Sequence, residues 1–201
     1  MPQLSNKTLI TIAGPTASGK TALAIELAKK WNTVIISADA RQFYTEMSIG
    51  TAKPSAEELA AAPHYFINNL SVQQPYDVGK YAAEVLELLD TLFQQHDKII
   101  LCGGSGLFIK AVTDGLDDLP ETLPEIREQV QLVYEQNGLL WLQDTIQLKD
   151  PEYFQVVDIH NPKRLLRALE VITQTGNTLS SYHKKVQQPR NFSNIKICLD
   201  L

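Results

Sequence analysis

Short apolar runs alternate with amphipathic stretches in the first half of the chain. Runs at Leu9–Ala13, Val34–Ser37 and Lys98–Cys102 have the length and composition of buried strands. Between them, apolar positions recur with helical spacing after residue 20, over 55–61 and from 78 to about 95. Strands that alternate with helices indicate a parallel α/β sheet.

Capping signals support the limits of these helices. Ser55 with Glu58 forms a capping-box pattern, and Asp77 stands at the N-cap position of the long helix. The helix after residue 20 places Leu23, Leu27 and Trp31 on one face, with Ala24 and Ala28 beside it. A further helix is expected over 107–112, ending by Gly115.

Only helical patterns are found from Asp117 to about Lys185. The expected helices are 124–137, ended by Gly138, then 139–148, 151–157 and 162–174, the last ended near Gly176. After a linker at 187–190, apolar residues alternate from Ile195 to Leu201, as in a strand. We therefore expect a P-loop NTPase-like α/β core formed by 1–116 and 187–201, with an all-helical insertion domain at 117–186. The chain stops within that last strand, which predicts a fragment of a longer protein.

Composition sets limits on the protein's class. The chain has 201 residues, of which 44% are hydrophobic, enough for one core and an appendage. The N-terminus lacks signal-peptide features and the apolar runs are too short to cross a bilayer, so we expect a cytoplasmic protein without a membrane partner. Cys102 and Cys198 lie far apart in apolar strands and are expected to be buried free thiols.

The charge is unevenly distributed. The net charge is −5, yet residues 161–190 contain six basic residues and one acid, Glu170, a net +5 against −10 for the rest. Such a basic segment on an acidic body is one sign of a nucleic-acid partner, but charge alone favours a solvated helix face and a basic loop.

One motif predicts phosphate binding. Residues 14–21 fit G-x-x-x-x-G-K-[ST], the P-loop, between a predicted strand and a predicted helix. Its residues are Gly14, Pro15, Thr16, Ala17, Ser18, Gly19, Lys20 and Thr21. The loop backbone and the helix N-terminus would hold phosphate oxygens, Lys20 would reach the outer phosphate, and Thr21 would hold Mg²⁺.

An acidic residue is expected near this loop. Asp39 follows the second strand, and in open α/β sheets ligands lie at the carboxyl ends of strands. Its carboxylate could accept a proton from an attacking group, although a surface turn would also suit an aspartate. The strand ending at Cys102 runs into Gly103-Gly104 instead of the Mg²⁺-binding Asp of P-loop kinases, which weakens a phosphoryl-transfer interpretation.

Four segments in order resemble the tRNA dimethylallyltransferase family across essentially the whole chain. They are GPTASGKT, SADARQFYTEMSIGTAKP (37–54), GGSGLF (103–108) and NPKRLLRALEV (161–171). The resemblance implies transfer of a dimethylallyl group from dimethylallyl diphosphate to N6 of adenosine 37, beside the tRNA anticodon. The IGTAKP stretch is its most specific part, because relatives that prenylate free adenine nucleotides differ there.

The resemblance also implies residue roles. Asp39 would be the general base and Thr16 a second catalytic contact, while the P-loop would hold diphosphate as a leaving group with Mg²⁺. The flipped adenosine would be read at Asp39, Ala40, Arg41 and Gln42, with Ser105 nearby. The anticodon stem-loop would contact Arg127 and the segment Lys163, Arg164, Leu165, Leu166 and Arg167. We expect a monomer.

The sequence also departs from the family pattern. Ala40 replaces the usual serine, and Phe43 and Thr45 vary in the loop expected to face the tRNA. The family's chains continue further, and the continuation includes an arginine that helps to bind diphosphate. Two alternatives stay open from the residues alone: a small-molecule or nucleotide kinase with a helical lid, and a non-catalytic RNA-binding P-loop protein.

Overall fold

The computed structural model describes residues 6–183 and 188–200. The chain divides into two compact units, Met1–Leu116 with Gln187–Leu201, here called the α/β unit, and Asp117–Val186, here called the helical unit. The division falls at the residues where the hydrophobic pattern changes from alternating strands and helices to helices alone.

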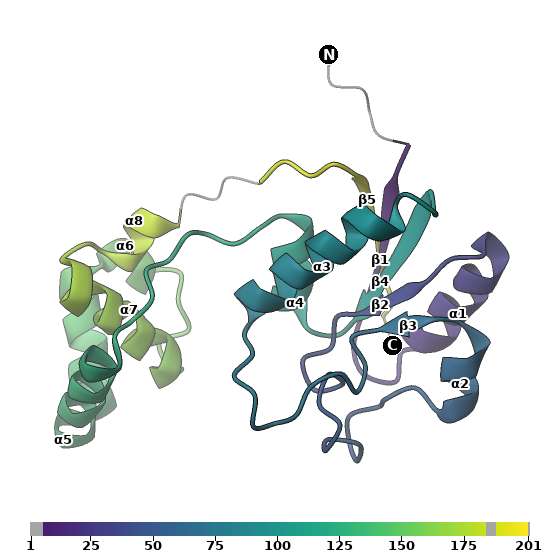
Figure 1. Cartoon of the computed structure of the whole chain (residues 1–201). Helices are drawn as coiled ribbons and strands as arrows, with labels where there is room; N and C mark the ends of the chain where they lie inside the picture. Colours follow the sequence, from purple (N-terminus) through teal and green to yellow (C-terminus); the bar gives the residue numbers. More distant parts are fainter. Residues whose placement is uncertain (1–5, 184–187, 201) are drawn as a thin grey trace. The chain divides into compact units, whose positions relative to one another are not determined.

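The α/β unit contains a five-stranded sheet in the order β3-β2-β4-β1-β5, with every pair parallel (Figure 1). Its elements are β1 (Thr8–Ala13), α1 (Lys20–Trp31), β2 (Ile35–Ser37), α2 (Ala56–Ala61), β3 (His64–Tyr65), α3 (Val78–Leu92), β4 (Lys98–Gly103), α4 (Gly106–Thr113) and β5 (Ser193–Cys198). The predicted α/β fold class is confirmed.

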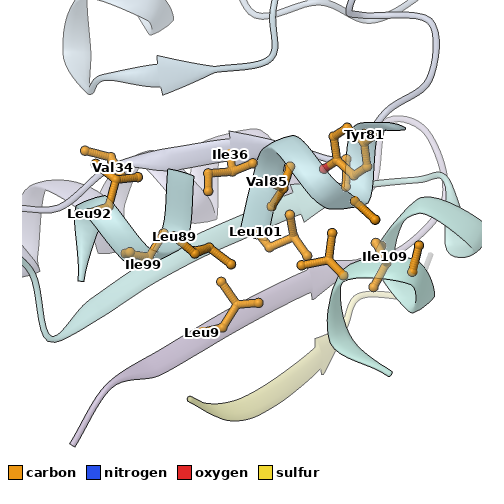
Figure 2. Close-up of a cluster of buried hydrophobic side chains, with 14 of the residues drawn as sticks. Leu9, Val34, Ile36, Tyr81, Val85, Leu89, Leu92, Ile99, Leu101 and Ile109 are labelled. Carbon is orange, nitrogen blue, oxygen red and sulfur yellow. The ribbon is translucent and has the colours of Figure 1, made fainter. Parts of the chain in front are cut away.

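The strands β1, β2 and β4 are buried on both faces of the sheet, and successive side chains of a strand point to opposite faces. In β1, Leu9 packs in a cluster with α3 and α4, whereas Ile10 and Ile12 pack in a cluster with α1. Figure 2 shows the first cluster, in which side chains of α3 such as Val85 and Leu89 lie over the strands. Each such buried side chain contributes about 1.5–3 kcal/mol.

The innermost positions of α1 differ slightly from those expected. Ala24, Ile25 and Ala28 are buried, while Leu23 and Leu27 are half-buried at the flanks of the same cluster. Small side chains let the helix axis approach the sheet closely, so the larger leucines cover the sides of the contact.

Two predicted limits and one missing strand need correction. The helix expected to reach about residue 95 ends at Leu92, and the one expected over 151–157 is α6, which ends at Phe154. The two-residue strand β3 pairs with Ile35 and Ile36 of β2, and the sequence pattern does not predict it. Two residues are too few to show a periodicity.

The Phe43 side chain lies in the core of the α/β unit. It is fully buried, stacked on Tyr81 at 5.2 Å and in contact with Phe66 and Phe108. Since a ring buried in this cluster is unavailable to a ligand, the residue at this position affects how its loop packs rather than touching a ligand itself.

The chain returns to the sheet through β5, as expected, although the strand begins at Ser193, before the predicted Ile195, and ends at Cys198. β5 pairs in parallel with β1 along six residues. Before it, the Arg190 guanidinium donates to the carbonyls of Val112 and Ala111 at 2.8 and 2.9 Å, near the C-terminal end of α4. Cys198 is exposed, which corrects the expected buried thiol, because β5 is an edge strand.

The helical unit contains α5 (Pro124–Lys149), α6 (Pro151–Phe154), α7 (Pro162–Thr175) and α8 (Leu179–Tyr182). Gly138 interrupts α5 with a φ of 77° and ψ of −175°, so the break expected there is present as a kink between two helical segments. The buried Asp150 carboxylate accepts from the Tyr153 N–H and the Ser180 hydroxyl, and so ties α6 to α8. In the described ranges, no helix is both long and apolar enough to span a bilayer.

Candidate active site

The loop from Gly14 to Gly19 follows β1, and two of its positions require glycine. A Cβ at Gly14 would lie 2.5 Å from the Leu199 carbonyl oxygen, so no larger residue fits there. Gly19 has a φ of 83° and precedes α1 as its N-cap without a side-chain cap. The first-turn N–H groups of α1 are therefore left for an external acceptor, where the helix dipole favours an anion.

Lys20 is the first residue of α1. Its ammonium donates to the Pro15 carbonyl within the loop and lies 3.5 Å from the Ser18 hydroxyl. The positive charge is thus held against the loop that precedes the helix N-terminus. Both features point to an anion such as a diphosphate.

A pocket of about 280 Å³ lies beside this loop. Its lining residues are Thr16, Ala17, Gly19, Lys20, Thr21, Ala22, Asp39, Gln42, Ala52, Glu58, Cys102 and Gly103. The structure thus brings most of the P-loop together with Asp39 and Gln42. Gly14, Pro15 and Ser18 form the turn itself and do not line the pocket.

Sequence reasoning missed several of the lining residues. Glu58 was interpreted only as part of a capping box, which is present: its carboxylate accepts from the Ser55 N–H at 2.8 Å. Ala52 lies in the IGTAKP stretch, and that motif was the available signal. Ala22 and Cys102 carry no local signal, because their place at the pocket depends on how α1 packs against β4.

Asp39 is held by hydrogen bonds on both sides. Its own carboxylate accepts from the Arg41 N–H at 3.1 Å, while the Ser105 hydroxyl accepts from the Ala40 N–H at 3.0 Å. Upstream, the buried Tyr81 hydroxyl donates to the Ser37 carbonyl at 2.8 Å. The aspartate is therefore both a turn residue and a pocket residue, held in place before any ligand binds.

Gly103 allows β4 to approach this segment. A Cβ there would lie 2.2 Å from the Ala38 carbonyl oxygen, so a side chain cannot fit. The position at which P-loop kinases carry an Asp for Mg²⁺ is thus filled by backbone. Within residues 6–183 and 188–200, no group of three or more His, Cys, Asp or Glu is placed to hold a metal.

Cys102 lies at the floor of the pocket. Burial raises the pKa of its thiol to about 11, an effect increased by Asp39 and opposed by Lys20. The thiol therefore stays protonated at neutral pH. Cys102 is a free thiol as expected, although it is half-buried rather than buried.

Two arginines predicted to contact RNA are engaged within the helical unit. The Arg167 guanidinium donates to the Thr122 hydroxyl and, at 2.7 Å, to the Pro120 carbonyl, and lies 3.4 Å from the Glu170 carboxylate. Arg127 lies 4.0 Å from the same carboxylate, although 66% of its side chain is exposed. Arg167 therefore stabilises the entry to α5, and Arg127 keeps most of its surface for a partner.

The remaining predicted contacts separate by burial. The Leu165 side chain is fully buried in the core of the helical unit, so its expected contact with tRNA is wrong for the side chain. Leu166 is half-buried in the same core, whereas Lys163 and Arg164 are exposed. Lys184 and Lys185, which belong to the basic segment, lie outside the described residues.

Comparison with known proteins decides the family. A model of the IPP transferase family matches residues 42–200. The chain belongs to the IPP transferase family. Two relatives named tRNA dimethylallyltransferase are similar to it: the protein of Cytophaga hutchinsonii is 47% identical over 98% of this chain, and that of Christiangramia forsetii is 48% identical over 95%.

The chain spans 64% and 63% of the length of these two relatives. Among solved structures, a tRNA isopentenylpyrophosphate transferase of Staphylococcus epidermidis is 35% identical with a TM-score of 0.57, covering 96% of this chain and 63% of its own. A eukaryotic dimethylallyltransferase acting on tRNA shares the fold, with a TM-score of 0.75 at 23% identity, over 96% of this chain and 48% of that one.

Proposed function

We propose that this member of the IPP transferase family transfers a dimethylallyl group from dimethylallyl diphosphate to N6 of adenosine 37 in tRNA and releases diphosphate. The observation that carries the proposal is one pocket that holds both an anion-binding P-loop and a carboxylate, Asp39. The names of the relatives supply the substrate class. Acting on tRNA, the enzyme would work in the cytoplasm, and we propose that it does so as a monomer.

The P-loop would act on the leaving group. The reaction breaks the bond between the allylic carbon and the diphosphate oxygen, and negative charge grows on the departing diphosphate. Lys20 and the first turn of α1 line the pocket, and the ammonium and the N–H groups of that turn would neutralise that charge. The backbone-filled position at Gly103 fits this use, because no phosphoryl group is transferred.

Asp39 would act on the acceptor. An exocyclic adenine amine is a weak nucleophile, since its lone pair is delocalised into the ring. As the carbon–nitrogen bond forms, the Asp39 carboxylate would accept the proton from N6. Thr16, in the same pocket, is proposed to contact the amine and the diphosphate.

We propose that the Thr21 hydroxyl, at the start of α1, would hold a Mg²⁺ ion. Thr21 lines the pocket, and Mg²⁺ is commonly bound by few protein oxygens, with substrate phosphates and water completing its shell. When bound, the ion would supply further positive charge to the leaving diphosphate.

The helical unit is proposed to bind the anticodon stem-loop. Its exposed Lys163 and Arg164, together with Arg127, are suited to phosphate contacts, which fix position without reading sequence. The target base must leave its stack to reach a pocket of this size.

The test uses the intact protein with unmodified tRNA and dimethylallyl diphosphate, and in parallel with ATP in place of the prenyl donor. We expect prenylated adenosine and released diphosphate in the first reaction and no ATP consumption in the second. ATP hydrolysis or phosphoryl transfer without prenylated adenosine would establish the kinase instead. A tRNA with guanosine at position 37 serves as the control acceptor.

A further inference from the structure

Both polar atoms of the Gln42 side chain have hydrogen-bond partners inside the protein. Its Oε1 accepts from the Ser37 hydroxyl at 3.0 Å, and its Nε2 donates to the carbonyls of Ala52 at 2.9 Å and Thr51 at 3.3 Å. The first bond reaches the end of β2, and the other two reach a loop that follows Tyr44. A single carboxamide thus joins the sheet to the loop that carries the pocket residue Ala52.

That loop has a backbone that needs support. Gly50 has a φ of 73° and Ala52 a φ of 47°, and left-handed backbone is unfavourable for alanine because of its Cβ. The loop has other ties. Within it, the Thr51 hydroxyl donates to the Met47 carbonyl at 2.8 Å, and the Lys53 ammonium donates to the side chain of Asn68, outside the loop, at 2.7 Å. Gln42 is the tie that reaches the end of β2.

We propose that Gln42 is a positioning residue that holds the 47–53 loop as a wall of the pocket, rather than a residue that reads the target base. To read adenine, a carboxamide presents its N–H and its carbonyl together to the base edge. Here the carbonyl and the amino group already have partners. Turning the side chain toward a ligand would leave the Ser37 hydroxyl and two loop carbonyls unpaired. The inference rests on the proposed function, since it concerns the same pocket.

The first experiment measures amide hydrogen exchange over residues 47–53 in the ligand-free chain. We expect Gln42→Leu, which keeps the volume but removes the hydrogen bonds, to speed exchange in this loop by about tenfold or more, because local opening becomes easier. Ser37→Ala, which removes only the hydroxyl that donates to Gln42 Oε1, should give a smaller increase. Arg41→Ala alters an exposed neighbouring side chain and serves as the control, with exchange unchanged. Unchanged exchange in both Gln42→Leu and Ser37→Ala overturns the proposal.

The second experiment separates positioning from base reading in the intact enzyme. With Gln42→Leu we expect kcat to fall by about tenfold while the affinity for tRNA stays within twofold. Gln42→Glu should be as slow as Gln42→Leu. A carboxylate has the shape of the carboxamide but cannot donate to the carbonyls of Thr51 and Ala52. A large loss of tRNA affinity, or acceptance of another base at position 37, with normal loop exchange would assign base reading to Gln42 and refute positioning. If the wild-type enzyme transfers no prenyl group, the proposed function fails, while the exchange experiment still decides the role of Gln42 in the loop.

Discussion

The polar side chains that line the pocket fall into two groups: those proposed to contact a ligand, and one proposed to position the neighbouring loop. Asp39 and Lys20 both line the pocket, one as a carboxylate and one as an ammonium. Gln42 also lines it, yet its polar atoms are taken by Ser37 and the 47–53 loop. Asp39 and Lys20 also have protein partners, but a carboxylate and an ammonium keep further hydrogen-bonding capacity. Lining a pocket is therefore a weaker argument for ligand contact than the hydrogen-bonding capacity that the protein's own contacts leave over.

Replacing the candidate base tests its role. Asp39→Ala should lower the single-turnover rate of prenyl transfer by about 10²–10⁴-fold, the usual contribution of a general base, with tRNA binding little changed. The measurement is rapid-quench transfer with saturating enzyme, together with a filter-binding titration of tRNA. A rate equal to that of the wild type would remove Asp39 from the mechanism.

Replacing the P-loop lysine tests the anion site. Lys20→Ala should weaken pyrophosphate binding by about 10–100-fold, since hydrogen bonds to charged groups are worth about 1.5–3 kcal/mol. Isothermal titration calorimetry with pyrophosphate makes the measurement on the chain itself. Lys29→Ala, an exposed lysine in the last turn of the same helix, is the control and should bind normally. Intact affinity in Lys20→Ala would mean that the loop does not hold the diphosphate.

Among whole elements, the contact of β4 with the segment after β2 determines where Asp39 lies. The two meet at Gly103, whose missing side chain leaves room for the Ala38 carbonyl. On the other side, Ser105 at the start of α4 holds Ala40. Neighbouring strand ends and one helix start thus place the carboxylate beside the P-loop.

Adding one methyl group at this contact should disturb both stability and binding. Gly103→Ala should destabilise the chain by about 1–3 kcal/mol, because backbone rather than a flexible side chain must shift. Urea unfolding measures this loss, and pyrophosphate titration should show weaker binding. Gly106→Ala places a methyl group where no atom lies within 4 Å and should leave both quantities close to wild type. Equal stability of the two variants would contradict the close approach.

Glu46, directly before the 47–53 loop, makes a pH-dependent hydrogen-bonded tie to Ser71 and Val72. Hydrogen bonds lower the pKa of Glu46 from 4.5 to about 2, with the Ser71 hydroxyl as the main donor and the Val72 N–H as a lesser one. A lowered folded pKa means that the tie is present above about pH 4.5 and is lost as the pH falls toward 2. We expect amide exchange at 71–72, corrected for intrinsic rates, to rise over that window in the wild type. In Glu46→Gln the rise should be absent, and a rise of equal size there would show that another group is responsible.

Across the molecule, charge is divided between an acidic majority and a basic stretch at 161–190. The basic residues of this stretch differ in their surroundings. Arg167 and Arg190 are engaged in holding the fold, whereas Lys163 and Arg164 are exposed. The exposed pair is therefore the better test of tRNA binding.

Removing that pair should change the salt dependence of binding. Lys163→Ala with Arg164→Ala should weaken tRNA binding and reduce the slope of log K against log salt by about 1.4–1.8, if each contacts one phosphate. Filter binding at several salt concentrations gives the slope. The charge-matched control is Lys29→Ala with Lys30→Ala in α1, which should leave the slope unchanged. Identical slopes in all three proteins would leave the pair as solvated surface.

Local pattern was sufficient for β1, the P-loop and α1, because each depends on neighbours within a few residues of the chain. The placement of Asp39 near the loop also followed, since the carboxyl ends of parallel strands share one edge of the sheet. The strand β3 escaped prediction because two residues carry no period. The pocket residue Ala52 was visible only as part of a motif, since its left-handed backbone depends on ties to residues outside the loop.

The amino-acid order alone thus predicted a phosphate-binding turn between a strand and a helix, and a family resemblance that the comparisons confirm. It left undecided which polar side chains are available to a partner. Arg167 has a partner 45 residues away in Thr122, and Arg190 one 78 residues away in Val112. Such pairs form only when distant elements pack together, and the free energy of leaving either partner unpaired then keeps the side chain in the fold.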